Sequence, residues 1–344
     1  MKNDKYNILT TKKLEAGYKS VALTSKLNLG LERGTLTSLI GTNGCGKSTL
    51  IRTLSGLQEP VGGYITVLDE KLSSLNAYKK SRLISHVLTD SDYLRSITVR
   101  NMVAMGRFPH TNFLGHLSSK DWEVVEQSMM KVKIEHKRDS LLFELSDGER
   151  QRTLIAKALA QDTPIIFLDE PTSFLDMRNK IEIMELLRTL AHTSEKAILL
   201  STHDIDIALQ TSDRIWLMNS GNITSGIPED LIISGKIAST FRSDAFTFNL
   251  ETGSFKVGHH GAKGINVTGD VTIAKKYTIQ ALQRVGYVLD TASPITVSVK
   301  PVEQDGLSPD RYMAEWRVIH ERKNDLCHSI EDVLYAVREI AVKS

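Results

Sequence analysis

The chain has 344 residues, and its 43 Lys and Arg against 41 Asp and Glu give a formal net charge of +2. This length accommodates one large domain and a small one, and the balanced charge excludes the strongly basic surface of a general nucleic-acid binder, so we expect no nucleic-acid partner. With two cysteines, no apolar signal segment and no apolar run near the ~20 residues that span a bilayer, the sequence indicates a cytoplasmic protein that reaches a membrane only through a partner.

The first forty residues have the pattern of strands, in which Leu27, Leu29 and Leu31 alternate with other side chains. A strand at residues 35–40 leads directly into a glycine-rich turn, and the apolar spacing from Leu50 predicts a helix after that turn.

The turn itself, GTNGCGKST at residues 41–49, matches the phosphate-loop pattern G-x-x-x-x-G-K-[ST] between a strand and a helix. Its glycines allow backbone N–H groups to surround a polyphosphate, which the positive end of the helix attracts. We expect Lys47 to reach the β- and γ-phosphates, Ser48 to ligate Mg²⁺ and Thr49 to lie beside the α-phosphate. The loop residues expected to contact the nucleotide are Gly41, Asn43, Gly44, Cys45, Gly46, Lys47, Ser48 and Thr49.

Residues from about 72 to 145 have a mainly helical pattern and suggest an inserted helical subdomain. The stretch LSDGERQR (145–152) follows, in which Ser146 and Glu149 form a capping box at the start of a helix. Gly148 lies just inside that helix, where glycine costs about 0.5–1 kcal/mol relative to alanine. We therefore expect a functional need for bare backbone at Gly148.

The apolar strand IIFLD (165–169) ends in Asp169, which is placed to hold the Mg²⁺ shell, and Glu170 is placed to polarise a water against the γ-phosphate. Two acids after a strand are by themselves typical of a solvated strand end, but a phosphate loop in the same chain favours the catalytic interpretation. His203, in LLSTHD, closes another strand and could hydrogen-bond the γ-phosphate or be structural. Strands that alternate with helices predict a mostly parallel sheet.

Two hairpins are predicted next, at residues 214–226 and 246–257, followed by a linker at 258–264. Residues 265–344 have their own strand signals (267–274, 295–301 and 313–320) and helical signals (276–286 and 329–342). We therefore expect a nucleotide-binding domain over residues 1–257 and a small α+β domain over 265–344.

In this order the motifs resemble the ATP-binding cassette (ABC) family, over residues 5 to about 255. The resemblance implies a P-loop NTPase fold of α/β class, with a mixed, mainly parallel sheet, antiparallel N-terminal strands and an inserted helical subdomain. It also implies ATP and Mg²⁺ as cofactors, and a head-to-tail dimer in which Ser146 and Gly148 contact the γ-phosphate of ATP bound by the second copy. This contact would explain the glycine.

By the same resemblance Asp176 contacts the opposing phosphate loop and Tyr18 stacks on adenine, although an exposed loop tyrosine is the alternative. The sequence departs from the family at Asp147 and Glu149, where LSGGQ is commoner, and at Thr89, where the family places a Mg²⁺-sensing glutamine. Thr89 either ligates Mg²⁺ or ends a strand, and the relay to the membrane partner lacks the family's glutamine.

VAMGRFPHTNFLG (103–115) is similar to a stretch in ATPases of importers for iron-siderophores, haem and vitamin B12; the alternative is a helix that stops at Gly106 and Pro109. The expected function is the ATPase of such an importer, at the cytoplasmic face of the membrane. It would dock on a permease near residues 90–115 and be served by an external substrate-binding protein.

The alternative function is a soluble ABC ATPase, for example in cluster assembly, while a GTPase lacks support because no N/T-K-x-D motif is present. The residues from 265 onward are compatible with a regulator site, dimer stabilisation or permease contact.

Overall fold

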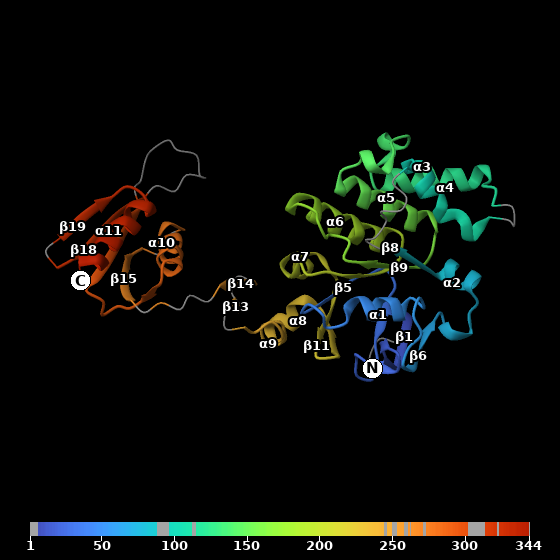
Figure 1. Cartoon of the computed structure of the whole chain (residues 1–344), viewed down its shortest axis with the longest axis horizontal. Helices are drawn as coiled ribbons and strands as arrows, with labels where there is room; N and C mark the ends of the chain where they lie inside the picture. The colour runs from blue at the N-terminus through green and yellow to red at the C-terminus, as the bar shows by residue number, and fades with distance from the viewer. Residues whose placement is uncertain are drawn as a thin grey trace. The chain divides into compact units, whose positions relative to one another are not determined.

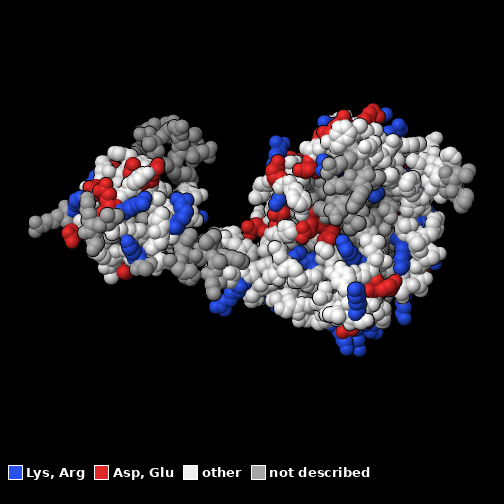
Figure 2. Space-filling model, viewed as in Figure 1, with Lys and Arg blue, Asp and Glu red and all other residues white. Residues whose placement is uncertain are grey.

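The computed structural model describes residues 6–87, 96–111, 115–243, 246–249, 253–257, 261, 263–270, 273–301, 314–321 and 323–343. The chain forms two units, Met1–Arg242 with Phe248–Ser254 and Ser243–Thr247 with Phe255–Ser344. Figure 1 shows the elements of each unit, and Figure 2 shows acidic and basic side chains on the visible face of both. Within the described residues no helix is both long enough and apolar enough to cross a bilayer.

The larger unit is built around a six-stranded sheet in the order β12-β11-β5-β10-β9-β8, parallel except for β12. Its strands are β5 (Leu36–Gly41), β8 (Ile84–Val87), β9 (Ile165–Asp169), β10 (Ala197–Ser201), β11 (Arg214–Asn219) and β12 (Asn222–Gly226). Both faces are covered: along β10, Ile198 and Leu200 enter one core while Ala197 and Leu199 enter the other. Burial on both faces explains the continuous apolar runs of these strands.

A second, antiparallel sheet in the order β4-β1-β6-β7 packs with helix α1 on one side of the central sheet. Its strands are β1 (Asn7–Glu15), β4 (Gly30–Glu32), β6 (Gly62–Val67) and β7 (Glu70–Lys71), and β2 (Gly17–Tyr18) pairs separately with β3 (Val21–Ala22). The antiparallel N-terminal strands and the mainly parallel central sheet confirm the predicted fold class.

Helices cover the other side of the central sheet, where α3, α4 and α5 gather (teal to green, Figure 1). The α-helices of this unit are α1 (Lys47–Leu54), α2 (Ala77–Leu83), α3 (Val99–Ala104), α4 (Ser119–Lys131), α5 (Asp147–Ala160), α6 (Met177–Thr193), α7 (Ile205–Thr211), α8 (Pro228–Ile233) and α9 (Lys236–Thr240). Short 3₁₀ helices are η2 (Leu72–Ser74), η4 (Met105–His110), η5 (Glu135–Lys137) and η6 (Leu142–Glu144). The stretch 72–145 also supplies β8, an edge strand too short for its period to show.

The smaller unit has a five-stranded sheet in the order β16-β15-β17-β18-β19, with two helices over its buried face. Its elements are β15 (Lys263–Gly269), α10 (Ile273–Arg284), β16 (Tyr287–Leu289), β17 (Ile295–Pro301), β18 (Ala314–His320), β19 (Lys323–Cys327) and α11 (Ile330–Lys343); the hairpin strands β13 (Phe246–Asn249) and β14 (Ser254–Val257) precede them.

The first strand of this unit lies earlier than the sequence suggests. Lys263 and Gly264, expected in the linker, begin β15, and Ile273, expected in a strand, begins α10. The β-branched residues from Val271 to Ile273 favour a strand locally, but Gly269 ends β15 in a left-handed conformation (φ 108°).

Candidate active site

The phosphate loop connects β5 to α1 through glycines that adopt conformations other residues disfavour. Gly44 and Gly46 have φ of 74° and 103°, in the left-handed region that glycine enters without a steric cost. At Gly41 a Cβ would lie 2.5 Å from the Met218 carbonyl oxygen of β11. The loop is thus shaped for glycine, and the positive end of α1 is directed at it.

Lys47, the first residue of α1, is only 7% exposed. Its Nζ donates to the carbonyl oxygens of Gly41 (3.0 Å) and Thr42 (3.2 Å). The ammonium group therefore lies against the phosphate loop, where we expect a polyphosphate to bind.

Ser48 and Asp169, which are 121 positions apart, are in direct contact. Ser48 Oγ donates to Asp169 Oδ1 at 3.1 Å, and Ser201 Oγ donates to the same oxygen at 2.6 Å. The parallel register pairs Ser201 with Asp169 across β10 and β9. Sequence reasoning missed Ser201; its position at the end of the strand that leads to His203 was the available signal.

Glu170 and His203 also meet, because Glu170 Oε1 lies 3.2 Å from His203 Nδ1. Glu170 Oε2 accepts a hydrogen bond from Ser173 Oγ (3.1 Å), and its backbone N–H donates to Ser201 Oγ (2.9 Å). Glu170 has a φ of 51°, a left-handed conformation that costs a non-glycine residue about 1–3 kcal/mol. Such strain is often found at functional sites.

Helix α5 begins as the sequence predicts. Ser146 is its N-cap and forms a reciprocal capping box with Glu149, whose pKa these hydrogen bonds hold below its ordinary value. Gly148 has a neighbour in its own chain that the sequence did not reveal: a Cβ there would lie 2.9 Å from Asn179 Oδ1. Asn179 in turn donates to Asp176, the N-cap of α6. A side chain at position 148 would therefore displace the end of the Asn179 side chain on α6.

Tyr18 lies beside the phosphate loop, since its hydroxyl accepts a hydrogen bond from Thr49 Oγ1 at 3.2 Å. Its side chain is about half exposed, so the ring is accessible. Cys45 is half-buried and Asn43 is exposed. Thr89 lies outside the described residues, and the structure therefore does not place it.

The importer-like stretch 103–115 has a structural role in the residues described. The α-helix α3 ends at Ala104, and the 3₁₀ helix η4 follows so close to α5 that a Cβ on Gly106 would overlap the Lys157 carbonyl oxygen. Arg107 is buried and donates to Asp121 Oδ1 and to the Ala160 carbonyl oxygen, each at 2.9 Å. This stretch therefore joins α4 to the end of α5.

Comparison with known proteins identifies a family and several relatives that are similar to this chain. The family described as ABC transporter matches residues 24–173. An uncharacterised ABC transporter ATP-binding protein of Methanocaldococcus jannaschii, MJ0873, is 36% identical over 65% of this chain and 78% of its own. The petrobactin import ATP-binding protein FpuD of Bacillus anthracis is 34% identical over 69% of this chain and 87% of its own.

Among solved structures, CbiO1 of Clostridium perfringens, part of the ABC transporter complex CbiONQ, has a TM-score of 0.61 and 28% identity, and the match covers 68% of this chain and 94% of that one. The family match lies in the larger unit, and the relatives do not favour a soluble non-transport ATPase. The chain therefore belongs to the ABC transporter family, as an ATP-binding and ATP-hydrolysing subunit.

Proposed function

We propose that this protein hydrolyses ATP to drive import of a metal chelate, such as an iron-siderophore, haem or cobalamin, through a separate permease. The observation that carries the catalytic part is the connected set of contacts from Ser48 through Asp169 and Ser201 to Glu170 and His203. In this set the general base is Glu170, which removes a proton from the attacking water, and His203 holds that carboxylate and donates to the γ-phosphate.

The residues present fit Mg²⁺. Ser48 offers a hydroxyl oxygen and Asp169 a carboxylate, and these hard oxygen donors are the ligands Mg²⁺ prefers together with phosphate oxygens. When bound, the ion would neutralise charge on the β- and γ-phosphates. Lys47 would then exchange its carbonyl contacts for phosphate oxygens.

The active unit in this proposal is a head-to-tail dimer, in which Ser146 and Gly148 of a second copy complete each ATP site and Asp176 contacts the opposing loop. Around Asp176 the side chains of Phe174 and Met177 are exposed by 89% and 65%. Large apolar side chains this exposed, next to a polar cap, are typical of a surface that another protein covers.

The transport part rests on the petrobactin import protein named above and on the resemblance of residues 103–115 to importer ATPases. The protein would lie at the cytoplasmic face of the membrane, docked on the permease through the helical subdomain near residues 90–115. There the exposed Phe108 follows the buried Arg107. A substrate-binding protein on the other side would deliver the chelate.

Glu170→Gln tests the catalytic assignment. We expect ATP hydrolysis to fall at least about 100-fold, because general-base catalysis contributes factors of about 10²–10⁴, while ATP binding is retained and the dimer persists in ATP and Mg²⁺. Phosphate release and size-exclusion chromatography measure the two effects. Glu185→Gln, an exposed acid on α6, is the matched control and should behave as the native chain. Unchanged turnover in Glu170→Gln contradicts the assigned base.

The transport assignment is tested separately, by reconstituting the chain in vesicles with a permease encoded next to it. Chelate uptake should require ATP and be abolished by Glu170→Gln. ATP hydrolysis that is indifferent to permease and chelate contradicts the importer role while leaving the ATPase assignment intact.

A further inference from the structure

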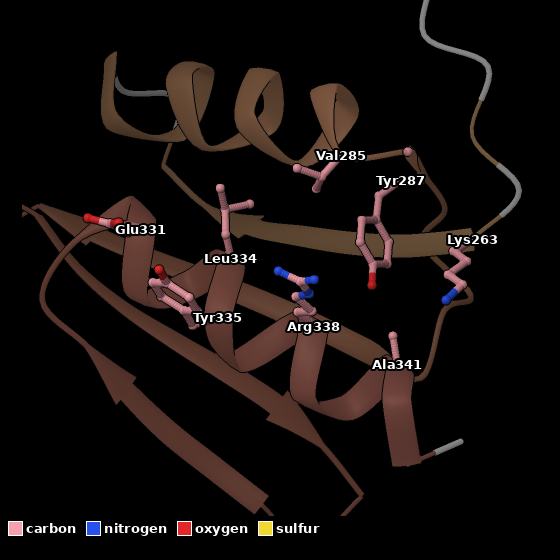
Figure 3. Close-up of a pocket in the computed structure, with 9 residues that line it drawn as sticks. Lys263, Val285, Tyr287, Glu331, Leu334, Tyr335, Arg338 and Ala341 are labelled. Atoms are coloured by element: carbon pink, nitrogen blue, oxygen red, sulfur yellow. The ribbon is translucent and has the colours of Figure 1, made fainter.

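The smaller unit contains a cavity of about 670 Å³ that the ATPase function does not use. It lies between helix α11 and the edge strand β16, next to the C-terminal end of α10 (Figure 3). Its size falls within the roughly 300–1,000 Å³ of sites for small organic ligands. The lining residues on which the argument depends are Lys263, Val285, Tyr287, Leu334, Tyr335 and Arg338.

Helix α11 presents two different faces. Val333, Val337 and Ile340 enter the core of the smaller unit. A second set lines the cavity at the spacing i, i+3, i+4, i+7, which places it on one side of a helix; its members are Glu331, Leu334, Tyr335 and Arg338. Of this second set, Leu334 also packs against the core, while Glu331, Tyr335 and Arg338 are exposed and available for a ligand. Tyr335 on this face is 61% exposed.

The charges around the cavity favour an anion. Lys263 and Arg338 both line it, and neither forms an ion pair with a residue in the part of the chain that the structure describes. Glu331 is the one acid in the lining, two helical turns before Arg338, and Figure 3 shows it at the end of the cavity away from Lys263. The end formed by Arg338 and Lys263 is therefore positively charged.

Tyr287 supplies a hydrogen-bond donor at this end. The residue is 6% exposed, and its hydroxyl has no hydrogen-bond partner among the described residues. Figure 3 shows that hydroxyl directed into the space between Arg338 and Lys263. Burial raises the pKa of Tyr287, so its hydroxyl keeps its proton at neutral pH and remains a donor. A hydroxyl that lines the cavity without a partner among the described residues can donate to a ligand oxygen.

We propose that this cavity binds a small organic carboxylate with an apolar body. Arg338 holds the carboxylate through its planar guanidinium, Lys263 adds a second cation, and Tyr287 donates its O–H to a carboxylate oxygen. The apolar body lies against Val285, Leu334 and Tyr335. The proposal goes beyond the transport function and does not depend on it.

Binding is tested on the full chain with 8-anilinonaphthalene-1-sulfonate, a fluorescent anion with an apolar body, in ADP and Mg²⁺ so that the nucleotide site is filled. We expect saturable fluorescence at one site per chain. Phenylacetate should displace the probe at least about tenfold more effectively than phenylacetamide, which has the same shape without the charge, because a charge-assisted hydrogen bond is worth about this factor. No saturable binding, or equal displacement by acid and amide, overturns the proposal.

Variants then locate the site. Arg338→Gln and Tyr287→Phe should each weaken phenylacetate binding several-fold, and Tyr287→Phe keeps the ring that packs in the core. Arg317→Gln removes the same charge from β18, outside the cavity lining, and should bind as the native chain. Arg338 is exposed, so Arg338→Gln carries the test even if Tyr287→Phe does not fold. Unchanged affinity in Arg338→Gln, or an equal loss in Arg317→Gln, overturns the proposed site.

Discussion

At the scale of single residues, Ser201 shows how one buried hydroxyl positions two acids. It donates to Asp169 and accepts from the backbone N–H of Glu170, and it is fully buried. Because its oxygen serves both contacts, a change at Ser201 should affect the proposed Mg²⁺ ligand Asp169 and the proposed base Glu170 together.

We expect Ser201→Ala to cost about 1–3 kcal/mol of unfolding free energy, since a buried backbone N–H loses its partner, and to lower ATP hydrolysis about tenfold or more. Ser38→Ala is the control, because Ser38 is equally buried and bonds Ser212 instead. Urea unfolding and phosphate release separate the effects. If the two variants lose stability and hydrolysis equally, Ser201 has only a structural role.

Cys45 permits a chemical test of the phosphate loop. It is half-buried, whereas Cys327, the other cysteine in the sequence, is 3% exposed. A thiol reagent should modify Cys45 first and block ATP binding, and ATP should protect it. Mass spectrometry of the labelled chain checks this, with Cys45→Ser as the control. Equal labelling of Cys45 with and without ATP contradicts its position at the nucleotide.

The buried histidine His86 in β8 should make the folding stability of the protein sensitive to acid. Burial lowers its pKa from 6.5 to about 4, and its Nδ1 is buried without a hydrogen-bond partner among the described residues. The folded state therefore holds the neutral ring, while the unfolded chain takes up a proton. The contribution of His86 to the free energy of unfolding is kept above pH 6.5 and is lost as the pH falls to about 4. The upper limit of this loss is about 3 kcal/mol.

His86→Phe should flatten the stability profile in this pH window and keep the stacking on Phe167. Denaturant unfolding between pH 7 and pH 4 measures the profile. His116→Phe changes an exposed histidine and should leave the slope unchanged. A slope that survives in His86→Phe assigns the acid sensitivity to other groups.

At the scale of elements, the stretch after α3 is held by one buried ion pair. Arg107 and Asp121 are both less than 10% exposed, and Asp121 also caps α4 through Ser118, which holds the pKa of its carboxyl below the ordinary value. The pair thereby joins three elements, η4, α4 and the end of α5.

We expect Arg107→Met to destabilise the chain by about 3–5 kcal/mol, because it leaves the Asp121 carboxylate buried without its cation. Arg178→Met removes an arginine that is 87% exposed from an i,i+4 pair on α6 and should cost about 0.5 kcal/mol or less. Thermal unfolding of both variants gives the comparison. Similar losses of stability in the two variants would show that burial of the Arg107–Asp121 pair does not increase its contribution to stability.

At the scale of the whole molecule, the two units have separate cores, one on each side of the central sheet in the larger unit and one of its own in the smaller. The phosphate loop, Asp169, Glu170 and His203 all belong to the larger unit. Nucleotide binding should therefore not need the smaller one.

Deleting residues 258–344 tests this independence. We expect the shortened chain to fold and to bind ATP with an affinity within about twofold of the full chain, because no predicted nucleotide contact is removed. Equilibrium binding of a fluorescent ATP analogue measures it, and dimerisation and hydrolysis of the same chain show whether the smaller unit acts on them. Loss of folding on deletion contradicts independent units.

The sequence by itself determined the parts of this protein whose residues are adjacent in the chain. The phosphate loop, the capping box at Ser146, the hairpin at residues 214–226 and the strand at 295–301 depend on local spacing and backbone preference, and their position and type were predictable. The strand before α10 was misplaced, because tertiary pairing overrode the local preference of its β-branched residues.

Only the tertiary structure decided which distant residues meet. Strand order and register place Ser201 beside Asp169, helix packing places Asn179 against Gly148, and the edge position of β16 leaves the cavity beside α11. Such contacts join residues far apart in sequence, and no local pattern encodes them. These contacts form when the apolar faces of separate strands and helices are buried against each other. That packing is a property of the whole core and not of any one segment.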